Sequence, residues 1–144
     1  MRLPVLFAVL SLPAAFALAA ESTPTSREFH MSECVAALEV STDALAEQVK
    51  AGMAELRPLL RHRLDAGAAF IGAAYVKGDR DEERSHALLS AAVARQKLLT
   101  GVELASRQEA CAVEGAQLLA KSDVLSRAVV TRIAEKRMKK LLGE

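Results

Sequence analysis

Apolar residues recur with the 3.6-residue period of an α-helix along almost the whole chain from residue 28 onward. Ala, Leu, Glu, Arg and Lys, which are all strong helix formers, dominate this part of the sequence. No segment of useful length shows the alternation of apolar and polar residues that indicates a half-buried β-strand. The sequence therefore predicts an all-α fold, an antiparallel bundle of four or five helices joined by short loops.

The amino-terminal segment has the features of a secretory signal peptide. Met1-Arg2 gives a positive start, residues 3–19 are apolar and uncharged, and Ala17-Leu18-Ala19 is a small-x-small cleavage site. The apolar run of about 17 residues is shorter than the roughly 20 that a membrane-spanning helix needs. We therefore expect cleavage after Ala19, no transmembrane span in the mature chain, and a periplasmic or secreted protein of the bacterial envelope.

Composition and turn residues predict one domain after a short leader. Residues 20–27 are polar and form a tether, and residues 28–144 suit a single helical domain. The clearest turn is Lys77-Gly78-Asp79, where glycine can end one helix and an aspartate can cap the next. Helix breaks are also expected at Thr100-Gly101 and before the last helix at 122–142. At Ser41-Thr42-Asp43 and at Pro58, the pattern allows either a new helix start or a bend.

Cys34 and Cys111 are the only cysteines in the chain. In an oxidising compartment such a pair predicts one disulfide. Helical spacing supports this, because both residues fall on apolar series that should face the interior. The series through Cys34 is Leu38, Leu45, Val49, Met53, Leu56 and Leu60, and that through Cys111 is Leu104, Leu118 and Leu125. The absence of a C-x-x-C motif argues against a redox-active role.

The carboxy-terminal helix is the strongest surface feature. After signal cleavage the chain is formally neutral, yet residues 127–144 carry six basic and two acidic side chains. The basic face comprises Arg132, Lys136, Lys139 and Lys140. The opposite, apolar stripe comprises Val130, Ala134, Met138 and Leu141. Such a helix can bind an acidic protein or an anionic membrane, or it can dock its stripe on the bundle and point its charges at solvent.

The sequence favours a non-catalytic binding or structural module, either a monomer or a homodimer. It contains no P-loop, no dinucleotide-binding glycine motif and no nucleophile elbow, and we assign no catalytic residue, metal ligand or cofactor in this interpretation. Nucleic-acid binding is not expected, because Phe29, Phe70 and Tyr75 are the only aromatic residues after the leader.

Histidines carry the alternative interpretation, a bundle that holds a metal or haem through His62 or His86. Glu83 and His86 have the Glu-x-x-His spacing of helical di-iron sites, but no second copy occurs. Arg57, Arg61 and Arg63 flank His62 and form a cationic cluster that either binds phosphate or an acidic partner or faces solvent.

The segment Ile71-Gly72-Ala73-Ala74-Tyr75-Val76-Lys77-Gly78, followed by Ala91-Ala92, resembles the first helix and turn of tetratricopeptide or Sel1-like repeats. A shift of about 34 residues in either direction finds no second copy. The resemblance implies that the helices before and after Gly78 pack as a hairpin through small residues.

Overall fold

The computed structural model describes residues 23–78 and 81–144, which form five α-helices and one 3-10 turn and contain no β-strand. In chain order the elements are α1 (Ser26–Lys50), η1 (Ala54–Leu56), α2 (Arg57–Val76), α3 (Glu82–Gln96), α4 (Gly101–Lys121) and α5 (Val124–Leu142). The predicted all-α bundle is confirmed. The predicted signal peptide, residues 1–19, and the first residues of the tether lie outside the described residues.

Two helices begin with a reciprocal cap. The Thr25 hydroxyl accepts a hydrogen bond from the Glu28 backbone N–H at 3.2 Å, while the Glu28 carboxylate accepts one from the Thr25 N–H at 2.7 Å. That backbone hydrogen bond holds the pKa of Glu28 below its usual 4.5. Thr100 and Glu103 repeat the arrangement at the start of α4. Because Thr25 supplies the cap, α1 begins two residues before the position expected from hydrophobic periodicity.

Other helix boundaries also follow local signals. Asp81 caps α3 and Asp123 caps α5, each by accepting a hydrogen bond from a backbone N–H three residues on. Gly78 follows α2 with a positive φ of 90°, as the turn prediction required. Pro58 lies in the first turn of α2, where its missing N–H costs no helical hydrogen bond.

The structure corrects two expectations about the first third of the chain. Residues 41–43 lie inside α1 without starting a new helix, because the Thr42 hydroxyl donates to a carbonyl one turn back within the helix. The apolar series does not continue through Met53, whose exposed fraction is 39%. Instead α1 ends at Lys50, and Gly52, with φ of 109°, turns the chain toward η1.

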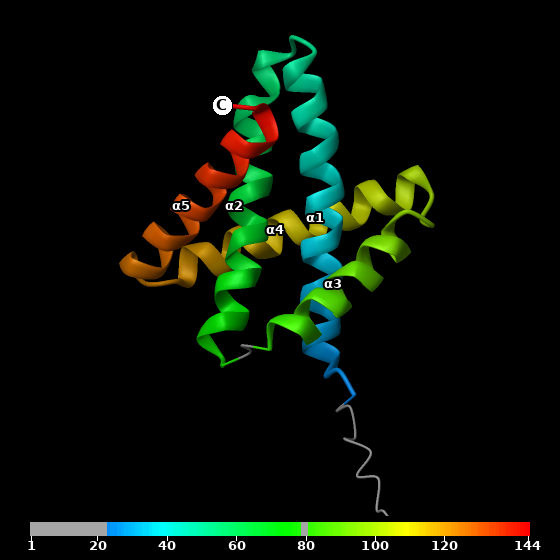
Figure 1. The fold of residues 1–144 in the computed structure, drawn as a ribbon, viewed down its shortest axis with the longest axis vertical. Helices are drawn as coiled ribbons and strands as arrows, with labels where there is room; N and C mark the ends of the chain where they lie inside the picture. Colours follow the sequence, from blue (N-terminus) through cyan, green and yellow to red (C-terminus); the bar gives the residue numbers. More distant parts are fainter. Residues whose placement is uncertain (1–22, 79–80) are drawn as a thin grey trace, which may run out of the picture.

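The helices cross as well as run side by side (Figure 1). Helices α1 and α2 form an antiparallel pair, α5 packs along α2, and α4 crosses behind α1 and α2. Helix α3 packs on the front of α1. Helices α3 and α4 diverge from their connecting turn, so that α1 lies between them.

Two apolar clusters fill the space between these helices. One joins α1, α2 and α5 through Ala46, Leu60, Leu64, Ala68, Ala69, Val130 and Ala134. The other joins α1, α2 and α4 through Cys34, Leu38, Ala66, Phe70, Cys111 and Ala112. Helices α1 and α2 contribute to both clusters and form the centre of the fold.

A glycine allows the crossing of α2 and α4. A Cβ atom placed on Gly115 would lie 2.6 Å from the Ala66 carbonyl oxygen and 2.8 Å from the Ala66 Cβ. No larger residue fits there without a shift of the backbone. The close approach places α4 directly against the middle of α2.

The predicted disulfide closes the crossing of α1 and α4. Cys34 and Cys111 are bonded with an S–S distance of 2.06 Å, and both residues are buried. The bond joins two residues that are 77 positions apart in the sequence and lie on different helices. The expectation that both cysteines face the interior is therefore confirmed.

A buried carboxylate lies beside the disulfide and binds α3 and α4 to α1. Glu33, with an exposed fraction of 6%, accepts a hydrogen bond at 2.5 Å from the Arg95 guanidinium. Its other oxygen accepts hydrogen bonds from the Gln96 amide and, at 3.1 Å, from Arg107. We call Glu33 with these three partners, together with the disulfide, the closed junction.

The hairpin implied by the resemblance to tetratricopeptide repeats is wrong. The small residue Gly72 faces α5, since a Cβ placed on it would lie 3.4 Å from a methyl group of Val130. Helix α3 packs on α1 instead of pairing with α2. The short motif therefore serves the contact between α2 and α5.

Candidate binding surface

Helix α5 docks on the bundle through the apolar stripe that the sequence predicts. Val130 and Ala134 are buried against α2, and Met138 and Leu141 pack at the edge of the same cluster. The stripe is therefore packed against the core and is not available to a partner. Of the alternatives left open by the sequence, the structure shows the docked helix with its basic face toward solvent.

The four residues of the basic face, Arg132, Lys136, Lys139 and Lys140, are all exposed. None of their side chains has a hydrogen bond or ion pair with another described residue. Arg137 differs, because it points toward α1 and contacts Glu39 at 3.1 Å and Asp43 at 3.8 Å. Helix α5 thus uses Arg137 to bind the bundle and leaves the four cations of its basic face without partners among the described residues.

The amino-terminal half of α5 exposes apolar side chains. Leu125, Val129 and Ile133 follow one another at i, i+4 spacing, and all three are exposed. Leu125, which the sequence analysis placed on the interior series of Cys111, has an exposed fraction of 75%. The expectation for Leu125 is wrong because α4 ends at Lys121 and no described helix covers this end of α5.

These side chains line an apolar groove of about 690 Å³ between α2, the end of α4 and α5. Tyr75 and Val76 at the end of α2 form the opposite wall, and Leu118 and Leu119 of α4 form part of the lining. We call this groove, together with the basic face of α5, the open face. The groove was not predicted from the sequence, although the i, i+4 spacing of Leu125, Val129 and Ile133 places these three apolar residues on one side of the helix.

His62 and His86, the candidate ligands of the alternative interpretation, are both exposed and lie on different helices, α2 and α3. Neither belongs to a group of three or more potential metal ligands among residues 23–78 and 81–144.

The cationic cluster around His62 is engaged in ion pairs. Arg57 contacts Glu144 at 2.6 Å, and Arg63 contacts Glu109 at 2.6 Å. Arg61 contacts Asp65 at 3.1 Å within α2. These arginines therefore hold α4 and the end of the chain against α2, and they do not form a free phosphate site.

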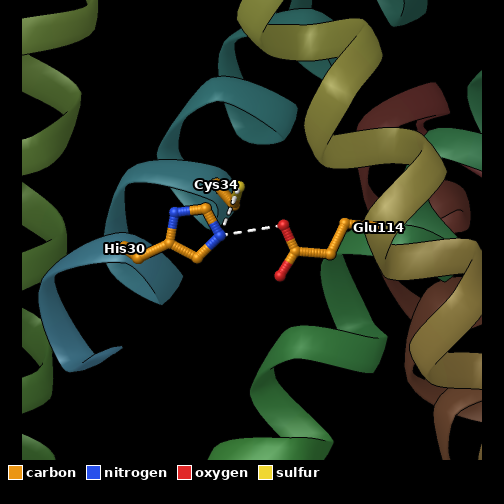
Figure 2. A group of neighbouring side chains, drawn as sticks. All are labelled: His30, Cys34 and Glu114. Atoms are coloured by element: carbon orange, nitrogen blue, oxygen red, sulfur yellow. Dashed lines mark hydrogen bonds and ion pairs between the residues drawn. The ribbon is translucent and has the colours of Figure 1, made fainter. Parts of the chain in front are cut away.

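A different histidine lies beside the disulfide (Figure 2). The His30 Nε2 atom is 2.8 Å from a Glu114 carboxylate oxygen and 3.9 Å from the Cys34 sulfur. This is the one group of three potential metal ligands that the described part of the chain contains. Because the Cys34 sulfur is bonded to Cys111, only the histidine and the carboxylate retain ordinary ligand atoms. The contact is a further link between α1 and α4, beside the disulfide and the Glu33–Arg107 pair.

No protein family, curated protein or solved structure matches the chain. The surface is therefore interpreted from its own chemistry. No helix in the described residues is long and apolar enough to cross a membrane.

Proposed function

We propose that this protein is a small exported helical module of the bacterial envelope, which binds without catalysis and presents the basic face of α5 to an anionic membrane surface. The observation that carries the proposal is the exposure of four cations, Arg132, Lys136, Lys139 and Lys140, that have no partner among the described residues. The docked stripe of α5 fixes the position of these cations on the bundle.

The chemistry of the neighbouring surface favours a membrane over an acidic protein. Each basic residue near an anionic leaflet contributes about 1 kcal/mol, so that four give an attraction of about 4 kcal/mol that salt weakens. Exposed apolar side chains beside such cations add binding by entering the boundary between headgroups and acyl chains. Leu125 and Val129 lie on the same helix, one or more turns before the cations, and provide such side chains.

Export is supported by the disulfide and by the leader sequence. Disulfides persist in oxidising compartments such as the bacterial periplasm and are rare in the cytosol. The intact mass of protein expressed with its own amino terminus tests this part of the proposal. We expect residues 20–144 less two hydrogens from the Cys34–Cys111 bond, and retention of residues 1–19 would contradict export.

Vesicle sedimentation tests the membrane surface. The wild-type protein should bind vesicles of phosphatidylglycerol and phosphatidylethanolamine, and not vesicles of phosphatidylcholine, with an affinity that falls as salt rises. The variant R132E/K136E/K139E/K140E should lose about a hundredfold or more in affinity, which corresponds to losing about 3 kcal/mol or more. Circular dichroism should show the same helicity, because all four side chains are exposed.

The matched control is R132K/K136R/K139R/K140R, which keeps all four charges and should bind anionic vesicles like the wild type. Equal vesicle binding by the charge-reversed protein, or equal binding to neutral vesicles, would exclude the proposal. Failure to bind any vesicle, combined with charge-dependent binding to an acidic protein, would assign the basic face to a protein partner.

A further inference from the structure

The apolar groove of the open face has the form of a ligand site. Its volume of about 690 Å³ lies within the range of about 300–1,000 Å³ that is typical of small-molecule pockets. Its walls are apolar side chains from three helices, among them Tyr75, Val76, Leu118, Val129 and Ile133. Exposed apolar surface that is gathered in one groove indicates a binding site more strongly than the same residues scattered singly.

Three cations lie along the groove in addition to the basic face of α5. Arg27 from the first turn of α1, Lys77 from the end of α2 and Lys121 from the end of α4 all contribute to its lining. All three are exposed, and none has a hydrogen bond or ion pair from its side chain to another described residue.

The acidic residue in the lining, Asp123, offsets only one of these three positive charges. Asp123 accepts hydrogen bonds at 2.8 Å from both the backbone N–H and the hydroxyl of Ser126. These bonds hold the pKa of Asp123 below its usual 3.8 and use its carboxylate to cap α5. The groove therefore offers an apolar floor and an excess of positive charge.

We propose that this groove binds a single-chain anionic amphiphile, a fatty acid, with its acyl chain along the apolar walls and its carboxylate among Arg27, Lys77 and Lys121. Charge complementarity selects this occupant. A second copy of the chain would cover the apolar walls, but a twofold contact would place the three groove cations of both copies in one interface. The site shares Leu125 and Val129 with the vesicle-binding face but holds the carboxylate elsewhere, since none of its three cations belongs to the four on α5.

The sequence supplies a reporter for the test. Tyr75 is the only tyrosine of a chain without tryptophan, and it lines the groove. Titration with monomeric laurate should change the tyrosine fluorescence to a plateau, and calorimetry should give one laurate per protein. Dodecan-1-ol, which has the same chain without the charge, should bind at least about tenfold more weakly.

Three variants locate the site. Val129→Asp places a charge in the groove and should weaken laurate binding about tenfold or more, whereas Val102→Asp should not change it. Val102 is the matched control, because its exposed fraction is 82% and it lies in the first turn of α4, outside the groove. The variant K77E/K121E should weaken laurate binding and leave dodecan-1-ol binding unchanged. Circular dichroism shows whether each variant keeps the wild-type helicity.

Equal laurate affinity of the Val129→Asp and Val102→Asp variants, or binding without a plateau, would overturn the proposal. A dimer that the Val129→Asp substitution dissociates, with no effect of laurate, would assign the groove to a second copy and also overturn it. Laurate binding by R132E/K136E/K139E/K140E within about threefold of wild type at physiological salt separates the two sites, because none of these four side chains lines the groove. Loss of vesicle binding alone would therefore leave the groove proposal standing.

Discussion

The closed junction and the open face use the same kinds of residue in opposite ways. In the closed junction, the arginines of α3 and α4 contact the buried carboxylate of Glu33, and the cysteines are joined to each other. On the open face, the four cations of the basic face have no side-chain partners among the described residues, and the apolar side chains are exposed. The carboxylate of the closed junction finds its partners within the fold, although the buried Oε1 atom of Gln96 has none among the described residues. The cations of the basic face find none.

The difference separates stability from binding. Groups that are already paired and buried stabilise the fold, but they have few free hydrogen-bonding atoms and little accessible surface with which to contact a ligand. Exposed cations and exposed apolar side chains add little to folding, yet they retain their full capacity to contact a partner. Substitutions in the closed junction should therefore change the free energy of unfolding most, and those on the open face should change it least.

Removal of the disulfide should have the largest effect. The bond closes a loop whose ends are 77 residues apart, and the loss of chain entropy in the unfolded state then contributes about 4 kcal/mol. The variant C34A/C111A should lose about this amount in urea unfolding. His30→Gln, which removes the exposed ion pair to Glu114 at the same crossing, should lose less than about 1 kcal/mol. Equal losses would show that the crossing is not held by the disulfide.

Glu33→Ala should have the next largest effect, a loss of about 2–3 kcal/mol in the free energy of unfolding. The substitution leaves Arg95, Gln96 and Arg107 without their shared acceptor, and Gln96 is fully buried. The two arginines are partly exposed and regain some solvation, which keeps the loss below that of a fully buried pair. The control is Glu47→Gln, which removes an exposed pair with Lys50 and should change stability by less than about 0.5 kcal/mol. If Glu33→Ala lost as little stability as Glu47→Gln, the closed junction would not contribute more to stability than exposed residues do.

The parts of this fold that the sequence predicts are those set by nearby residues. The caps at Asp81 and Asp123 and the turn at Gly78 each depend on residues within a few positions. The disulfide was predictable because two cysteines allow one pairing. The basic face of α5 follows from helical periodicity alone.

The parts that escaped prediction depend on contacts between distant residues. Glu33 contacts residues 62 to 74 positions away, and nothing near it in the sequence marks it as buried. Likewise, the exposure of Leu125 and Val129 depends on where α4 ends and how α2 lies, which their own spacing does not reveal. From the sequence alone, Gly115 is only a residue of low helix propensity, and its role at the crossing with Ala66 appears in the structure.

Alanine substitution at two helical glycines should give the smallest changes in the free energy of unfolding, and the two changes should have opposite signs. Both lie inside helices and face another helix, Gly115 at the crossing of α2 and α4, and Gly72 between α2 and α5 on the open side. Gly115→Ala should destabilise by about 1–3 kcal/mol, because the new methyl group would lie 2.6 Å from a backbone oxygen.

Gly72→Ala should instead stabilise the fold by up to about 1 kcal/mol, the gain in helix propensity of alanine over glycine. Its methyl group would meet only a methyl group of Val130 at 3.4 Å, an ordinary van der Waals contact. Urea unfolding of the two variants gives both values. Destabilisation of equal size at both positions would mean that α5 is packed against α2 as tightly as α4 is. The side of the molecule with the groove would then be as closed as the junction, and the separation of stability from binding would not hold.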